Sequence, residues 1–244
     1  MNLRLSLRHL TEGSNTSTRP SDSDHCLEYC VLSESTGHAR GFLFVIEGID
    51  GSGKTSACDE LEVLLTQDGY DVVRFREPTN ESKWGREIRE RSPRGELTPE
   101  EELELFIRDR EWHVTNRINP ALASGKVILL DRYFFATGAY QSTVTPYHWK
   151  EILKRNREEI HAPDPDLLII LDVPAPLGLE RATGRQGSAN LQFEKLDRLV
   201  KVRQNYLEIA AEDACRSLVI DARQPLSLVV AQVHDAILST LRSR

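Results

Sequence analysis

The 244-residue sequence has no long hydrophobic run, no zinc-type cysteine pairs and no excess of basic residues. Its longest apolar run, residues 167–171, is much shorter than the roughly 18 residues of a membrane-spanning helix. We therefore expect a buried strand there and no membrane partner. The formal net charge of −7 argues against a nucleic-acid-binding protein, because phosphate backbones favour basic surfaces. It does not exclude nucleotide binding, which needs positive charge at one place alone.

The four cysteines, Cys26, Cys30, Cys58 and Cys215, lack the repeated two-residue spacing of zinc sites. Cys26 and Cys30 lie near His25, but a structural zinc ion needs four well-placed ligands. We therefore expect reduced thiols in a cytoplasmic protein.

The composition changes near residue 40. Residues 1–40 are rich in Ser, Thr, Asp and Glu with weak apolar periodicity, which is typical of a disordered extension. The basic start at residues 1–9 has the charge of an organelle address, but Asp22 and Asp24 soon follow, and transit peptides avoid acids. We expect residues 41–244 to form a single folded domain.

Short apolar runs alternate with helical patterns from residue 41 onward. The predicted strands are 42–46, 72–75, 127–130, 167–171 and 218–220, and helical patterns cover 54–67, a stretch from 99, 191–211 and 225–241. Near-continuous runs of Val, Ile and Leu indicate parallel strands covered on both faces. The alternation predicts an α/β fold, a doubly wound parallel sheet with helices on both faces.

Residues 48–55 match the Walker A phosphate-binding pattern, between a predicted strand and a predicted helix. Glycines allow the tight turn that points N–H groups at an anion, and the helix adds its positive dipole end. Lys54 is expected to reach the β- and γ-phosphates of ATP, and Thr55 to bind Mg²⁺. The predicted nucleotide-binding residues are Gly48, Ile49, Asp50, Gly51, Ser52, Gly53, Lys54 and Thr55.

Other strand ends narrow the class of P-loop protein. The sequence has no Asn-Lys-x-Asp motif, which argues against a GTPase. Asp131 and Arg132 follow one predicted strand, at the sheet edge where ligands of α/β proteins bind. There Asp131 is suited to the magnesium shell and Arg132 to a phosphate, with a purely structural Asp–Arg pair as the alternative.

A series of motifs resembles the thymidylate kinase family from about residue 41 to the C-terminus. In the family's order they are 47–55, Arg76-Glu-Pro-Thr, Gly85-Arg-Glu-Ile-Arg89, Leu105-Phe-Ile-Arg-Asp-Arg110, Pro120-Ala-Leu-Ala-Ser-Gly-Lys, Asp131-Arg-Tyr, Ala139-Tyr-Gln141 and Phe193-Glu. The resemblance implies a nucleoside monophosphate kinase that transfers phosphate from ATP to dTMP with Mg²⁺. It also implies a homodimer.

The resemblance further implies roles at an acceptor site. Asp50 would accept a hydrogen bond from the acceptor's 3′-hydroxyl, Phe106 would stack on the thymine ring, and Arg110 would meet the base edge. Residues four apart share a helix face, which fits the last two. The alternatives are a plain core role for Phe106 and a surface ion pair of Arg110 with Asp109 or Glu111.

Further acceptor contacts follow from the same resemblance. Tyr140 would pack under the sugar and Gln141 would hydrogen-bond the base, with ordinary helix packing as the alternative for both. Arg89 and Arg132 would hold the acceptor phosphate, although a solvated face is the alternative for Arg89. The predicted acceptor-site residues are Asp50, Glu77, Arg89, Phe106, Arg110, Arg132, Thr137, Tyr140 and Gln141.

Two positions depart from common family patterns. Some members have an arginine within the phosphate loop where this chain has Gly51. In this chain another positively charged side chain must therefore offset the negative charge of the transferred phosphoryl group. Arg181 and Arg185, beside a stretch suited to a short mobile lid, are the candidates, with a surface role as the alternative. Many relatives have a serine at the position of Ala136. The predicted catalytic residues are Lys54, Arg132, Arg181 and Arg185, and the predicted metal ligands are Thr55 and Asp131.

Two other functions stay open at this point. One is a kinase for another nucleotide or nucleoside, because a single methyl group separates thymine from uracil and gives weak discrimination. The other is a non-catalytic nucleotide-binding protein, which the joint presence of Lys54, Thr55, Asp131 and Arg132 disfavours.

Overall fold

The computed structural model describes residues 40–183 and 189–243, with the backbone alone for residues 189–194. The predicted extension up to residue 39, the cluster of His25, Cys26 and Cys30, and Arg185 lie outside these residues. The strands are β1 (Phe42–Glu47), β2 (Val72–Arg76), β3 (Val127–Asp131), β4 (Leu167–Asp172) and β5 (Ser217–Asp221). The helices are α1 (Lys54–Gln67), α2 (Lys83–Arg91), α3 (Pro99–His113), α4 (Asn119–Ala123), α5 (Phe134–Gln141), α6 (Trp149–Glu158), α7 (Ala175–Thr183), α8 (Ala189–Glu212) and α9 (Leu226–Arg242).

The five strands form one parallel sheet in the order β2-β3-β1-β4-β5. The central strands β1, β3 and β4 are almost wholly buried, whereas the edge strands β2 and β5 are largely half-buried. This is the burial expected of apolar runs covered on both faces. The predicted doubly wound α/β class is confirmed.

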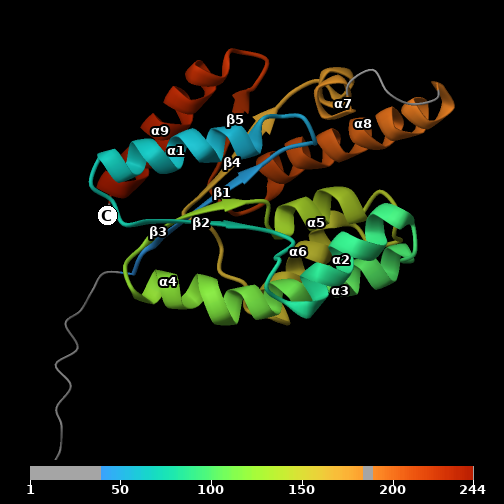
Figure 1. Ribbon diagram of the computed structural model, residues 1–244, viewed down its shortest axis with the longest axis horizontal. Helices are drawn as coiled ribbons and strands as arrows, with labels where there is room; N and C mark the ends of the chain where they lie inside the picture. The colour runs from blue at the N-terminus through green and yellow to red at the C-terminus, as the bar shows by residue number, and fades with distance from the viewer. Residues whose placement is uncertain (1–39, 184–188, 244) are drawn as a thin grey trace, which may run out of the picture. The chain divides into compact units, whose positions relative to one another are not determined.

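Helices cover both faces of the sheet (Figure 1). Helices α1 and α9 pack together on one face, and α4 and α5 lie on the other, where α8 packs against α5. Helices α2 and α3 form a pair beside α5, so these three helices lie together at one end of the sheet.

The strand register brings charged residues together at one edge. Asp131 of β3 is aligned with Ile46 of β1 and with Arg76 of β2, while Asp172 of β4 is aligned with Asp221 of β5. Each observed strand ends one residue later than the apolar run that predicted it, because the backbone pairing continues into the charged residue that follows the run. The carboxyl edge of the sheet therefore carries the polar chemistry, as predicted for parallel strands.

Several helices were not predicted from the apolar pattern. Helix α2 buries only Gly85 and Ile88, and α6 is capped by His148 rather than by a common N-cap residue. A π-helical turn, Val114–Ile118, joins α3 to α4. Such elements have few apolar residues at helical spacing and depend on tertiary packing, so apolar periodicity does not predict them.

Candidate functional site

The phosphate loop links β1 to α1 through backbone conformations that suit glycine. Gly48 has φ 140° and Gly51 has φ 79°. A Cβ added at Gly51 would lie 2.1 Å from the carbonyl oxygen of Gly178, so a side chain there would clash with α7 as well as strain the backbone. The loop is therefore fixed by close packing against α7.

Lys54 begins α1 and is 6% exposed. Its Nζ donates hydrogen bonds to the carbonyl oxygens of Gly48, at 2.9 Å, and Ile49, at 2.8 Å. Burial, followed by the charge of Arg132, lowers the pKa of Lys54 to about 8. The ammonium group thus lies inside the phosphate loop, where anionic oxygens would restore its ordinary pKa.

Thr55 and Asp131, the predicted metal ligands, are in contact. Thr55 Oγ1 donates to Asp131 Oδ2 at 2.9 Å, and Arg76 Nε lies 3.8 Å from the same oxygen. Asp131 Oδ1 is buried and has no hydrogen-bond partner among the described residues. No group of three or more His, Cys, Asp or Glu that could hold a metal occurs in the described part of the chain. A hydroxyl and one carboxylate suit Mg²⁺, which usually takes few protein ligands and completes its shell with phosphates and water.

Glu47, at the end of β1, is a buried carboxylate that the sequence analysis did not single out. Its Oε1 accepts hydrogen bonds from the backbone N–H groups of Tyr133, at 2.7 Å, and Ala136, at 3.0 Å. Its Oε2 accepts from the Tyr206 hydroxyl at 2.8 Å. Burial raises the pKa of Glu47 to about 7, although Arg132 acts in the opposite direction. Glu47 therefore joins β1 to α5 and α8 behind the phosphate loop.

The Glu47→Gln variant should lose part of the pH dependence of stability. Because the folded-state pKa is raised from 4.5 to about 7, the stabilisation is complete below pH 4.5 and is lost as pH rises through 7. The free energy of unfolding of the wild type should therefore fall by about 3 kcal/mol between these two pH values. Glutamine can keep these neighbours without ionising: its oxygen accepts from both amides, and its NH₂ donates to the Tyr206 hydroxyl, which reverses the direction of that hydrogen bond. Urea unfolding between pH 4.5 and 7 should give a flatter profile for the variant. Parallel profiles would contradict this, and the exposed Glu60→Gln serves as control.

Arg110 lies at the centre of a buried network and is 1% exposed. Its Nε donates to Glu77 Oε2 at 2.8 Å, its Nη1 to Asn156 Oδ1 at 2.6 Å and its Nη2 to Thr137 Oγ1 at 3.0 Å. Burial alone would raise the pKa of Glu77, but Arg110 and His113 hold it below its ordinary value. The alternative of a surface ion pair for Arg110 is wrong, because the side chain is buried and paired with Glu77.

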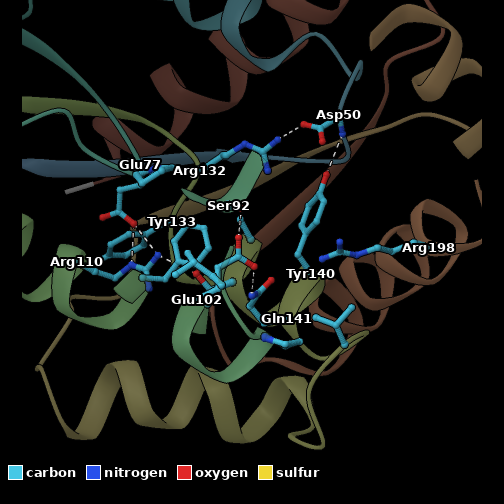
Figure 2. A pocket seen from close by; sticks show the side chains of 17 residues that line it. Asp50, Glu77, Ser92, Glu102, Arg110, Arg132, Tyr133, Tyr140, Gln141 and Arg198 are labelled. Atoms are coloured by element: carbon cyan, nitrogen blue, oxygen red, sulfur yellow. Dashed lines mark hydrogen bonds and ion pairs between the residues drawn. The ribbon is translucent and has the colours of Figure 1, made fainter. Parts of the chain in front are cut away.

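A cavity of about 470 Å³ gathers most of the predicted acceptor-site residues (Figure 2). Phe106 is half-buried and lines this cavity, so it is not plain core. Asp50 and Arg132 lie toward the phosphate loop, and Gln141 lies at the far end. The predicted residues that line the cavity are Asp50, Glu77, Phe106, Arg110, Arg132, Thr137, Tyr140 and Gln141.

Asp50, Arg132 and Tyr140 form the end of the cavity next to the phosphate loop. Arg132 Nη2 is paired with Asp50 Oδ1, and its guanidinium lies 5.3 Å from the centre of the Tyr140 ring. The backbone N–H of Asp50 donates to the Tyr140 hydroxyl at 3.0 Å. Arg132 has a left-handed φ of 72°, so the turn after β3 directs it to this position.

Two arginines that were predicted to contact phosphate, Arg89 and Arg181, do not line the acceptor cavity. Arg89 is exposed and donates to the carbonyl oxygen of Pro78, which itself lines the cavity. Arg181 donates to the Ala222 carbonyl oxygen at 3.0 Å and lines a second cavity of about 350 Å³. This second cavity borders the phosphate loop and is lined by Gly51, Ser52, Gly53, Ser56, Arg181, Ala222, Gln224, Leu226 and Val229.

The cavity also contains polar residues that the sequence analysis missed. Glu102 accepts a hydrogen bond from Gln141 Nε2 at 2.7 Å, and Ser92 donates to its other oxygen. Arg198 lies at the edge, with its Nε 3.3 Å from Thr143 Oγ1. Glu102 lies beside Glu100, Glu101 and Glu104 in the sequence, and no pattern there separates it from these neighbours.

Comparisons with known proteins agree with this geometry. The thymidylate kinase family model matches residues 46–233. The chain is 42% identical over 204 residues to a thymidylate kinase of Xanthomonas euvesicatoria, covering 84% of this chain and 86% of that protein. It is 43% identical over 199 residues to a protein of Archaeoglobus fulgidus named probable thymidylate kinase, covering 82% and 96%.

The chain belongs to the thymidylate kinase family. The family match contains the phosphate loop and all residues of the larger cavity. None of the helices in the described part of this thymidylate kinase family member is long and apolar enough to cross a membrane.

Proposed function

We propose that this chain transfers the γ-phosphate of ATP to dTMP, giving ADP and dTDP, with Mg²⁺ as cofactor. The observation that carries this proposal is one cavity that is lined by Phe106 and Arg110 as well as by Asp50 and Arg132 at the edge of the phosphate loop. Family membership and the names of the relatives support the same reaction.

The pocket residues would bind the acceptor nucleotide. Phe106 would offer an aromatic face to the base, and Arg110, fixed by its buried partners, would donate its remaining Nη1 N–H to a base carbonyl. Asp50 would accept from the sugar 3′-hydroxyl while Tyr140 packs under the sugar. Arg132 would hold the acceptor phosphate at the end nearest the loop, and Arg89 would approach it from the Pro78 side.

The donor would lie on the phosphate loop. The second cavity, lined by Arg181 and Gln224, borders the phosphate loop, which supports it as the site of the donor nucleoside. Thr55 and Asp131 would hold Mg²⁺, which supplies positive charge to the phosphates of the donor. Arg181 is thus proposed to act on the donor side.

Transfer needs positioning more than base catalysis. An oxygen of the acceptor phosphate, already anionic near neutral pH, attacks the γ-phosphorus in line. The new O–P bond forms as the bridging O–P bond to ADP breaks. Lys54 and Arg132 would offset the charge on the oxygens in transfer, and their fixed positions reduce the reorganisation required. A homodimer, a cytoplasmic location and a catalytic role for Arg185 stay predictions from the sequence.

An ADP-release assay with ATP, Mg²⁺ and a panel of acceptors tests the proposal. We expect strong stimulation by dTMP, weaker stimulation by dUMP, and none by UMP, CMP, AMP or GMP. If another monophosphate gives the highest kcat/KM, the dTMP assignment is wrong. ADP release that no acceptor stimulates would instead favour a nucleotide-binding or ATPase role.

A further inference from the structure

The acidic start of α3 contains four glutamates with different environments. Glu101 closes a capping box with Thr98, its Oε2 accepting from the Thr98 N–H at 2.8 Å. Glu104 is exposed and accepts from Arg155 Nη2 at 2.7 Å. Glu100 is exposed and lies near the positive end of the helix dipole. Glu102 instead faces the acceptor cavity, so neither capping nor a surface ion pair explains it.

Both oxygens of Glu102 have a partner from another element. Ser92, in the turn after α2, donates its hydroxyl proton to Oε1, and Gln141 at the end of α5 donates from Nε2 to Oε2 at 2.7 Å. Figure 2 shows Glu102 between these two residues. A carboxylate has acceptors alone, so the amide must turn its NH₂ group toward Glu102. The contact therefore fixes the orientation of the Gln141 amide, with its NH₂ group toward Glu102 and its carbonyl oxygen on the opposite side.

The carbonyl oxygen of Gln141 is then left for the cavity. Among the described residues no donor is bonded to it, and it is not among the fully buried atoms without a partner, which are Asp131 Oδ1 and Tyr133 OH. The oxygen therefore keeps accessible surface in the cavity. Arg110 lines the same cavity, and its bonds to Glu77, Asn156 and Thr137 leave one of its five N–H donors, on Nη1, without a partner among the described residues. The two residues together offer an acceptor and a donor to one base edge.

We propose that Glu102 is a positioning residue for base selection, acting by holding the Gln141 carbonyl as an acceptor for the N3–H of the base. This rests on the proposed dTMP kinase function. A thymine or uracil nucleotide has a single ring N–H, at N3, next to a carbonyl oxygen at C4. Cytosine has an unprotonated N3 and an amino group there, so it would place acceptor against acceptor and donor against donor. Buried groups left unpaired in this way give strong discrimination.

The Glu102→Gln variant tests the proposal, because a neutral amide can also donate to Gln141 and so permits the Gln141 amide to turn over. Steady-state kinetics should show KM for dTMP raised about tenfold with kcat within about twofold. The ratio of kcat/KM for dTMP to that for dCMP should fall at least about tenfold. The ratio of kcat/KM for dTMP to that for dUMP should not change, because Gln141 does not recognise the 5-methyl group. Ser92→Ala, which removes one anchor of Glu102, should shift the dTMP-to-dCMP ratio in the same direction by less.

Glu104→Gln is the matched control, since it makes the same chemical change two residues later on the exposed face of α3 and should alter none of these ratios. An unchanged dTMP-to-dCMP ratio in Glu102→Gln, or an equal loss for dTMP, dUMP and dCMP, would overturn the proposal. Calorimetric titration of dTMP and dCMP onto wild type and variant gives the same comparison without turnover. If wild type phosphorylates none of these nucleotides, the proposed function fails, whereas the binding comparison still decides the role of Glu102.

Discussion

Replacing Lys54 with alanine is expected to lower kcat for dTMP phosphorylation by at least about 10³-fold. The Lys54 ammonium lies within the phosphate loop, 2.8 Å and 2.9 Å from two loop carbonyl oxygens, and is almost wholly buried. A charge held in a water-poor site stabilises developing phosphate charge far more than one in bulk water. Coupled ADP release with saturating ATP and dTMP measures the loss.

The loss should come without unfolding. Removing a buried ammonium whose pKa is already lowered by burial relieves a desolvation cost, so thermal unfolding of Lys54→Ala should stay close to wild type. Lys154→Ala is the control, because Lys154 is exposed on α6 and paired with Glu158. A Lys54→Ala enzyme within tenfold of wild type would show that the loop lysine does not carry the transfer.

The second large effect is expected for Arg132→Ala, with a fall in kcat/KM for dTMP of about 10³-fold. Arg132 is paired with Asp50 and lies over the Tyr140 ring, so one side chain links the phosphate loop to the acceptor cavity. Arg132→Lys should recover part of the loss, since it keeps the charge but not the planar fork. Steady-state kinetics on both variants give the comparison.

The control for Arg132 is Arg108→Ala, an exposed arginine on α3 that does not line the acceptor cavity. It should leave kcat/KM unchanged. If Arg132→Ala retains near-wild-type turnover, the acceptor phosphate must be held elsewhere and the Asp50–Arg132 pair is merely structural.

The fold was largely predictable because its signals are local in the sequence. The central strands are continuous apolar runs, and the phosphate loop is fixed by glycines between a strand and a helix. Helix α2 was not predicted, because it buries few residues and its remaining positions are charged. Its packing against α3, which no pattern within α2 encodes, accounts for its position.

The acceptor site was predictable where a residue follows a strand or repeats a family motif. Phe106, Arg110, Tyr140 and Gln141 were expected together, and they line one cavity. Their supporting partners were predicted in part. Glu77 and Thr137 were expected at the site and both bond Arg110, but Asn156, which bonds Arg110 from a distant segment, and His113, which bonds Glu77, were not. Such long-range pairing leaves no spacing signal in a single sequence.

Burial separates residues that look alike in the sequence. Glu47 and Glu102 both lie among other motif residues or acids, yet one is a buried link behind the phosphate loop and the other faces the acceptor cavity. Arg89 and Arg181 matched the residue type required for phosphate, but their side chains bond to Pro78 and Ala222. Residue type therefore predicted the chemistry, and tertiary structure decided which side chains reach each cavity.

The most direct test of the account is the balance of products from γ-labelled ATP with dTMP and Mg²⁺. We expect the label to appear in dTDP, with one dTDP formed for each ADP and almost no free phosphate. Label released mainly as inorganic phosphate, with no dTDP formed, would contradict it, because the cavity beside the phosphate loop would then not hold the acceptor.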